Sequence, residues 1–160
     1  MDRAQTGATL LEVAVALSIA ATTAALIWRT EPLGARLALR AASVGLISDL
    51  RLVQARAIGE RSLDRAYGLE IPIGADRYTL FVRSGGARVP LRLRTLPPGV
   101  RVTYARFGGT NSSSVFFTGV SLFGAPSGGG TVTFTNRAGR LCVRIAPATA
   151  RPRVSNANCP

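Results

Sequence analysis

Gly7-Ala8-Thr9-Leu10-Leu11-Glu12-Val13 opens an apolar segment that ends near Trp28. Glu12 is the only ionisable side chain between Ala8 and Trp28, and it lies inside the hydrophobic run. A carboxylate in hydrocarbon costs about 3 kcal/mol or more unless it is paired or protonated, so an acid in such a segment indicates a function. Residues 8–28 would form a helix about 30 Å long, which is enough to span a bilayer.

Two simpler interpretations explain part of this pattern. A secretory signal peptide is cut after its apolar core, and the alanine pairs at 20–21 and 24–25 could supply that site. Glu12 within the core argues against it. A plain membrane anchor fits the length but leaves Gly7 and Glu12 unexplained.

The N-terminal pattern resembles the class III signal sequence of type IV prepilins and pseudopilins. Its parts are a short polar leader (residues 1–7) ending in glycine, an apolar helix that follows at once, and a glutamate five positions after the glycine. The resemblance implies that prepilin peptidase cleaves after Gly7 and methylates the new N-terminus, Ala8. Ala8 departs from the phenylalanine that many members carry there.

The same resemblance implies a location and a role in assembly. Residues 8–28 would stay in the inner membrane as a single span, with the C-terminal part in the periplasm, until the subunit enters a pilus or pseudopilus. There Glu12 would neutralise the terminal amine of Ala8 on a neighbouring subunit. The expected partners are therefore prepilin peptidase, the inner membrane and other pilins or pseudopilins.

The composition argues against an enzyme. The chain has 160 residues and no histidine, so a catalytic imidazole and a His-ligated metal are both excluded. With two cysteines and no clustered acids we expect no metal site and no cofactor. Asp49, Glu60 and Asp64 recur at helical spacing among arginines, which predicts a solvated helix face.

The positive charge lies in the second half of the chain. Residues 1–76 hold eight arginines and eight acids, whereas residues 77–160 hold twelve arginines and no Asp or Glu. A basic surface binds DNA without sequence preference, because it releases counterions from the phosphates. Lipopolysaccharide, anionic lipid or an acidic partner pilin would also suit such a surface.

Residues 37–58 predict an amphipathic helix, because apolar residues recur at helical intervals. Pro32 and Gly34 are expected to kink or briefly break the helix before it, and residues 29–66 form its periplasmic part and a connector. The stretch 46–58 resembles the helix of the H-type minor pseudopilins. The apolar positions are Leu39, Val44, Leu46, Ile47, Leu50, Val53 and Ala57.

Residues 67–160 predict a β-rich domain of short strands separated by turn residues. Alternation in 89–94 and 100–104 places Arg92, Arg94 and Arg101 opposite an apolar face. We expect an α+β protein with the type IV pilin fold, in which antiparallel sheets pack against the N-terminal helix. The predicted strands are 67–71, 77–83, 89–94, 100–105, 115–117, 131–135, 140–145 and 151–154.

Two features near the C-terminus suggest further chemistry. Cys142 and Cys159 would form a disulfide in an oxidising compartment, worth about 3 kcal/mol, although two free thiols are the alternative. Ala150-Arg151-Pro152-Arg153 resembles the Gly-Arg-x-Arg element of related DNA-binding minor pilins, with Ala150 in the glycine position. With Arg140 and Arg144, these arginines are the candidate contacts to double-stranded DNA in natural transformation. The alternative is a hairpin whose outward residues happen to be arginine.

Three functions therefore stay open. The chain is a minor pilin of a type IV pilus, a minor pseudopilin of a type II secretion system, or a membrane-anchored basic binding module that does not polymerise.

Overall fold

A computed structural model describes residues 9–62, 64–108, 112–119, 126–147, 149–156 and 159–160, without the side chains of 26–32. The chain divides into two units, residues 1–34 and residues 35–160, and each is described by itself. The predicted cleavage site at Gly7 and Ala8 lies outside the described residues.

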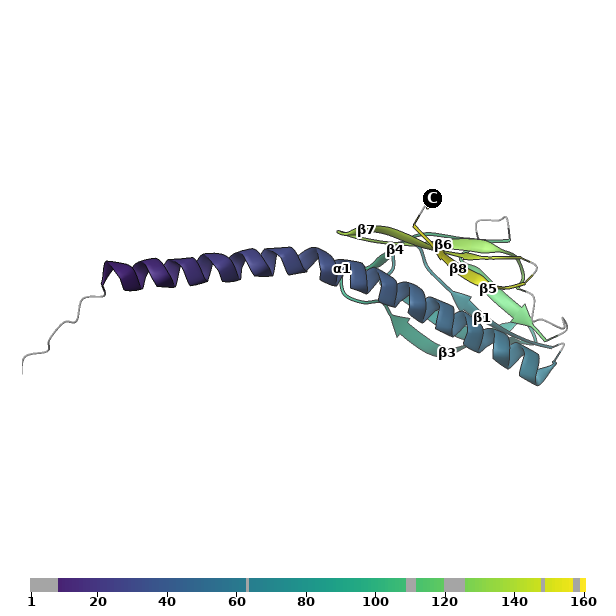
Figure 1. The fold of residues 1–160 in the computed structure, drawn as a ribbon. Coiled ribbons are helices and arrows are strands. Elements are labelled where there is room, and N and C mark those ends of the chain that lie inside the picture. Colours follow the sequence, from purple (N-terminus) through teal and green to yellow (C-terminus); the bar gives the residue numbers. More distant parts are fainter. Residues whose placement is uncertain (1–8, 63, 109–111, 120–125, 148, 157–158) are drawn as a thin grey trace, which may run out of the picture. The chain divides into compact units, whose positions relative to one another are not determined.

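One helix, α1 (Leu10–Glu60), enters both units (Figure 1). The helix is continuous through Pro32 and Gly34, so the predicted break is wrong. A proline removes a single hydrogen bond of the ladder, and helix-favouring alanine, leucine and arginine on either side continue the helix. Thr9 caps its start: the Thr9 carbonyl accepts from the Glu12 and Val13 amides at 2.9 and 3.2 Å.

The first unit presents an apolar helical surface. All described side chains from residue 9 to residue 25 are exposed, including Leu10 at 89% and Leu17 at 65%. The hydroxyls in this stretch are satisfied by the helix itself; those of Ser18 and Thr22, for example, donate to carbonyls one turn back. Over the described residues, no helix has both the length and the apolar character needed to cross a membrane.

Residues 35–160 add two four-stranded antiparallel sheets to α1. Sheet A has the strand order β3-β2-β1-β5 and sheet B the order β4-β6-β7-β8. Each predicted strand is confirmed, with ends that differ by at most two residues. The strands are β1 (Arg65–Glu70), β2 (Arg77–Ser84), β3 (Ala87–Thr95), β4 (Arg101–Phe107), β5 (Ser114–Thr118), β6 (Gly130–Asn136), β7 (Gly139–Ile145) and β8 (Pro152–Ser155).

A single core joins α1 to the inner faces of both sheets. The helix contributes Leu39, Ala42, Leu46, Leu50 and Val53, which recur every three or four residues and are at most 5% exposed. Val44 was predicted on the same stripe but is 64% exposed, because it lies on the opposite side of the helix. From the sheets, the fully buried side chains include Leu69, Val102, Phe107, Val115, Phe117, Val132, Phe134 and Val143.

Asp49 is not solvated, contrary to the prediction. It is 1% exposed and accepts hydrogen bonds from the Tyr78 hydroxyl at 2.7 Å and from the Arg94 guanidinium at 2.9 and 3.1 Å. Burial, together with the hydrogen bond to Asp49, raises the pKa of Tyr78 far above its ordinary value. Asp49 therefore fastens α1 to β2 and β3 from within the core.

The predicted orientation of β3 is reversed for the same reason. Arg94 is paired across the sheet with Tyr78, which is buried, so both face α1. Leu91 and Leu93 are 41% and 55% exposed on this edge strand. With Arg94 turned inward to reach Asp49, the alternate leucines lie on the exposed face. The alternation of β3 alone does not show which of its faces is covered by α1. The corresponding prediction for Arg101 is correct: it is exposed, and the next residue on β4 is buried.

Candidate anion-binding face

The outer face of sheet B is defined by the register of its four strands. Inward positions such as Val102, Phe134 and Val143 are fully buried, so the alternate positions point outward. Arg106 lies opposite Thr131, Thr131 opposite Arg144, and Arg144 opposite Arg153. The first row across the sheet is therefore Arg106, Thr131, Arg144 and Arg153.

A second row lies four residues further along the strands. Arg101 pairs with Thr135, and Thr135 pairs with Arg140. At about 3.3 Å per residue the two rows are about 13 Å apart. We call the two rows together the arginine face; it holds Arg101, Arg106, Arg140, Arg144 and Arg153.

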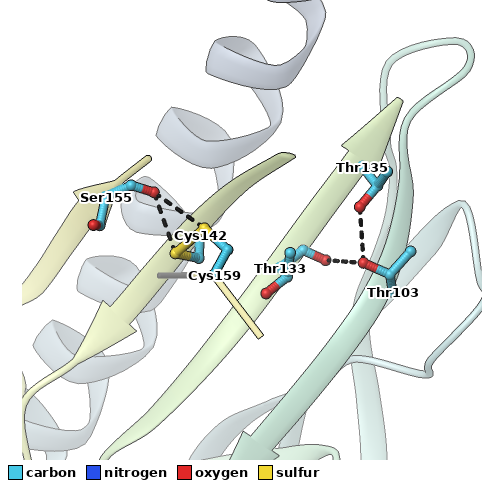
Figure 2. The surroundings of a disulfide bond; sticks show 6 residues. All are labelled: Thr103, Thr133, Thr135, Cys142, Ser155 and Cys159. Carbon is cyan, nitrogen blue, oxygen red and sulfur yellow. Dashed lines mark hydrogen bonds between the residues drawn. A yellow bond between two sulfur atoms is a disulfide. The ribbon is translucent and has the colours of Figure 1, made fainter. Parts of the chain in front are cut away.

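The predicted disulfide lies between the two rows (Figure 2). Cys142 and Cys159 are joined, with their Cα atoms 5.6 Å apart, and both sulfurs contact the Ser155 carbonyl. Thr133, the cross-strand neighbour of Cys142, is fully buried. The disulfide therefore fixes Cys159 and Pro160 to the middle of the arginine face.

The bulged strand β4 is fixed beside this disulfide by threonines. The Thr103 and Thr135 hydroxyls lie 2.8 Å apart, and the Thr103 hydroxyl also donates to the Thr133 carbonyl at 3.4 Å (Figure 2). The register of β4 against β6 shifts between Val102 and Tyr104. Because of that shift, Arg101 and Arg106 both point outward although they are five residues apart.

The arginine face contains no acidic side chain, because residues 77–160 hold no Asp or Glu. Four of the eight acids of residues 1–76 form ion pairs in the described part of the chain, on α1, on sheet A and in the loop before β2. The guanidinium groups of the arginine face favour phosphates and carboxylates as ligands, because a guanidinium binds them in a bidentate manner. These ion pairs are Arg65–Glu60, Arg77–Asp76, Arg88–Glu70 and Arg94–Asp49, at 3.6, 3.3, 3.6 and 2.9 Å.

Three of the four arginines predicted from the sequence share this face: Arg140, Arg144 and Arg153. Arg151 instead precedes β8 and points to a cavity beside α1. Arg101 and Arg106 were not predicted as site residues. Arg101 lies in the predicted strand 100–105, but Arg106 follows that strand, and neither the pairing of β4 with β6 nor the register shift after Val102 is visible in the sequence.

Ala150, in the glycine position of the predicted Gly-Arg-x-Arg element, has a left-handed backbone conformation, which glycine adopts more readily than other residues. Its φ is +55°, in the left-handed region, and it is 3% exposed. The Ala150 amide donates to the Ala146 carbonyl at 3.0 Å, and the Ala146 amide donates to the Arg151 carbonyl at 3.3 Å. These hydrogen bonds hold the turn closed around Ala150.

Comparison with known proteins places the fold. No protein-family model matches the chain, and a search of curated proteins also finds no match. Two solved structures of the minor pseudopilin EpsH from the type II secretion system of Vibrio cholerae are similar. One aligns with a TM-score of 0.56 and 14% sequence identity, over 76% of this chain and 98% of that chain. The other aligns with a TM-score of 0.57 and 13% sequence identity, over 77% of this chain and 97% of that chain. The protein therefore has the α+β fold of the minor pseudopilins, with an N-terminal helix packed on antiparallel sheets.

Proposed function

We propose that the chain is a non-enzymatic structural subunit of a bacterial filament, a minor pseudopilin or minor pilin. The observation that carries this proposal is the minor-pseudopilin fold joined to an N-terminal helix with an exposed apolar surface. Exposed apolar patches of this kind mark surfaces that other proteins or lipids cover. The likeness to EpsH favours a type II secretion pseudopilus, and the basic second half of the chain favours a type IV pilus.

The N-terminal helix enters the filament through Glu12 in this proposal. Prepilin peptidase removes residues 1–7 and methylates Ala8, and residues 8–28 anchor the subunit in the inner membrane before assembly. Glu12 lies in the first turn of α1, and within the described residues its carboxylate has no partner. A buried carboxylate needs a partner, and the terminal amine of the next subunit supplies one.

Mass spectrometry of the protein purified from membranes tests the processing step. We expect a mature chain that begins at Ala8 and carries one additional methyl group, and an unprocessed chain when Gly7 is replaced by valine. A mature protein cut after residue 21 or residue 25 would indicate an ordinary secretory signal and contradict the proposal.

A second function is supported by the arginine face: binding of double-stranded DNA. Five arginines on one sheet surface, with no acid in the same half of the chain, give a strongly positive field. The spacing of about 13 Å between the rows is close to the major-groove width of about 12 Å, so the rows suit the phosphates of both strands. Lipopolysaccharide and anionic lipid are the competing ligands.

The alternative to a filament subunit is a membrane-anchored basic module that never polymerises. It would share the arginine face and the apolar helix but would not need Glu12. A Glu12→Val variant separates these two functions, because only a filament subunit needs the carboxylate for assembly.

A further inference from the structure

A cavity of about 550 Å³ lies beside α1 at the edge of sheet B. One wall comes from the helix, which contributes Arg51 and Gln54. The other wall comes from the turn before β8 and the start of that strand, which contribute Ala150, Arg151, Pro152 and Arg153. Segments that are about 100 residues apart in the sequence thus meet around one space.

Among the described residues, the cavity lining includes three guanidinium groups and no carboxylate. Asp49 is the nearest acid to Arg51 in the sequence, but its two oxygens accept from Tyr78 and Arg94 on the sheet A side. Three like charges around one space raise the local concentration of anions. A guanidinium binds a phosphate through two parallel hydrogen bonds.

The turn that holds Arg151 in this wall is closed by its own backbone. Ala150 is buried in a left-handed conformation, and the hydrogen bonds between Ala146 and residues 150 and 151 fix the point at which Arg151 leaves the turn. Pro152 then fixes the following backbone angle. The two arginines of this segment are therefore positioned on either side of a rigid residue.

Arg153 belongs both to the arginine face and to this cavity. It ends the first row, opposite Arg144, and it also lines the cavity with Arg51. A polyanion that crosses the strands from Arg106 to Arg153 therefore reaches the cavity directly after Arg153. We infer that the cavity binds one phosphate group of the nucleic-acid backbone, and that Arg51 of α1 is a further binding residue. This inference rests on the proposed DNA binding by the arginine face.

Fluorescence anisotropy with a labelled DNA duplex, over a series of NaCl concentrations, tests the inference on the full chain in zwitterionic detergent. Arg51→Gln should weaken binding several-fold and reduce the slope of log K against log salt by about 1, the loss of one phosphate contact. Arg40→Gln is the matched control. It is exposed on the same side of α1, about 16 Å away along the helix, and outside the cavity.

The outcomes separate the cavity from the face. If Arg51→Gln and Arg40→Gln bind DNA as the parent does, with the same slope, the cavity inference is wrong and DNA binding by the face stands. If the parent binds no duplex, both are wrong. If Arg51 is needed only for binding to phosphatidylglycerol vesicles, and not to DNA, the phosphate belongs to a lipid and the nucleic-acid assignment is overturned.

Discussion

Replacing Asp49 with alanine should lower the free energy of unfolding by about 3 kcal/mol or more. The substitution leaves the Tyr78 hydroxyl buried without its acceptor, at 3% residue exposure, and removes the carboxylate that binds Arg94. Arg94 is 38% exposed and regains water, so most of the loss comes from Tyr78 and the cavity left behind. Urea unfolding of the full chain, followed by circular dichroism, measures the change.

Asp76→Ala is the control for this prediction. Asp76 pairs with Arg77 at 3.3 Å, but both side chains are more than 60% exposed, so the pair is worth no more than about 0.5 kcal/mol. Tyr78→Phe in the Asp49→Ala background should then cost little more, because the hydroxyl has already lost its partner. Equal stability of Asp49→Ala and Asp76→Ala would show that the buried network does not fasten α1 to sheet A.

Replacing four arginines of the arginine face with glutamine should weaken DNA binding by about 100-fold or more at moderate salt. Each lost phosphate contact removes about 0.9 from the slope of log K against log salt, so the slope should fall by about 3 to 4. Anisotropy titrations with a duplex measure both quantities. The four positions are Arg106, Arg140, Arg144 and Arg153.

A control with the same loss of net charge distinguishes DNA binding at the arginine face from attraction by the overall charge of the protein. Four exposed arginines elsewhere, replaced together with glutamine, should weaken binding by less than about tenfold, since long-range charge is screened beyond about 10 Å at 0.1 M salt. If the two quadruple variants lose affinity equally, DNA is attracted by overall charge and the arginine face is not a site. The control positions are Arg36, Arg40, Arg83 and Arg92.

The local pattern of the sequence predicts the fold well. The eight strands follow from alternation and turn residues, and the disulfide follows from the two cysteines of the predicted periplasmic domain. The helix stripe is correct at Leu39, Leu46, Leu50 and Val53 because three- and four-residue spacing places side chains on one face.

Pairing between distant segments could not be predicted from local pattern. Asp49 looks solvated among the arginines of its helix until β2 and β3 bring Tyr78 and Arg94 to it. Arg101 and Arg106 join Arg144 only because β4 pairs with β6, and the bulge after Val102 sets which of its residues face outward. Arg51 lines the cavity together with Arg151 and Arg153, which are about 100 residues away in the sequence. Each of these contacts depends on tertiary register, which one-dimensional periodicity does not contain.

The central claim is that the chain is a filament subunit whose helix assembles through Glu12. The most direct test measures the amount of the protein in sheared, purified filaments. The parent and the variants Glu12→Val and Thr22→Val are compared by quantitative immunoblot, with membrane levels measured in parallel. Thr22→Val removes a hydroxyl on the same segment that only bonds its own helix. We predict that the parent and Thr22→Val are present in filaments, whereas Glu12→Val is processed and reaches the membrane but is lost from filaments. Filament content of Glu12→Val equal to that of the parent, or absence of the parent from filaments, would contradict the account.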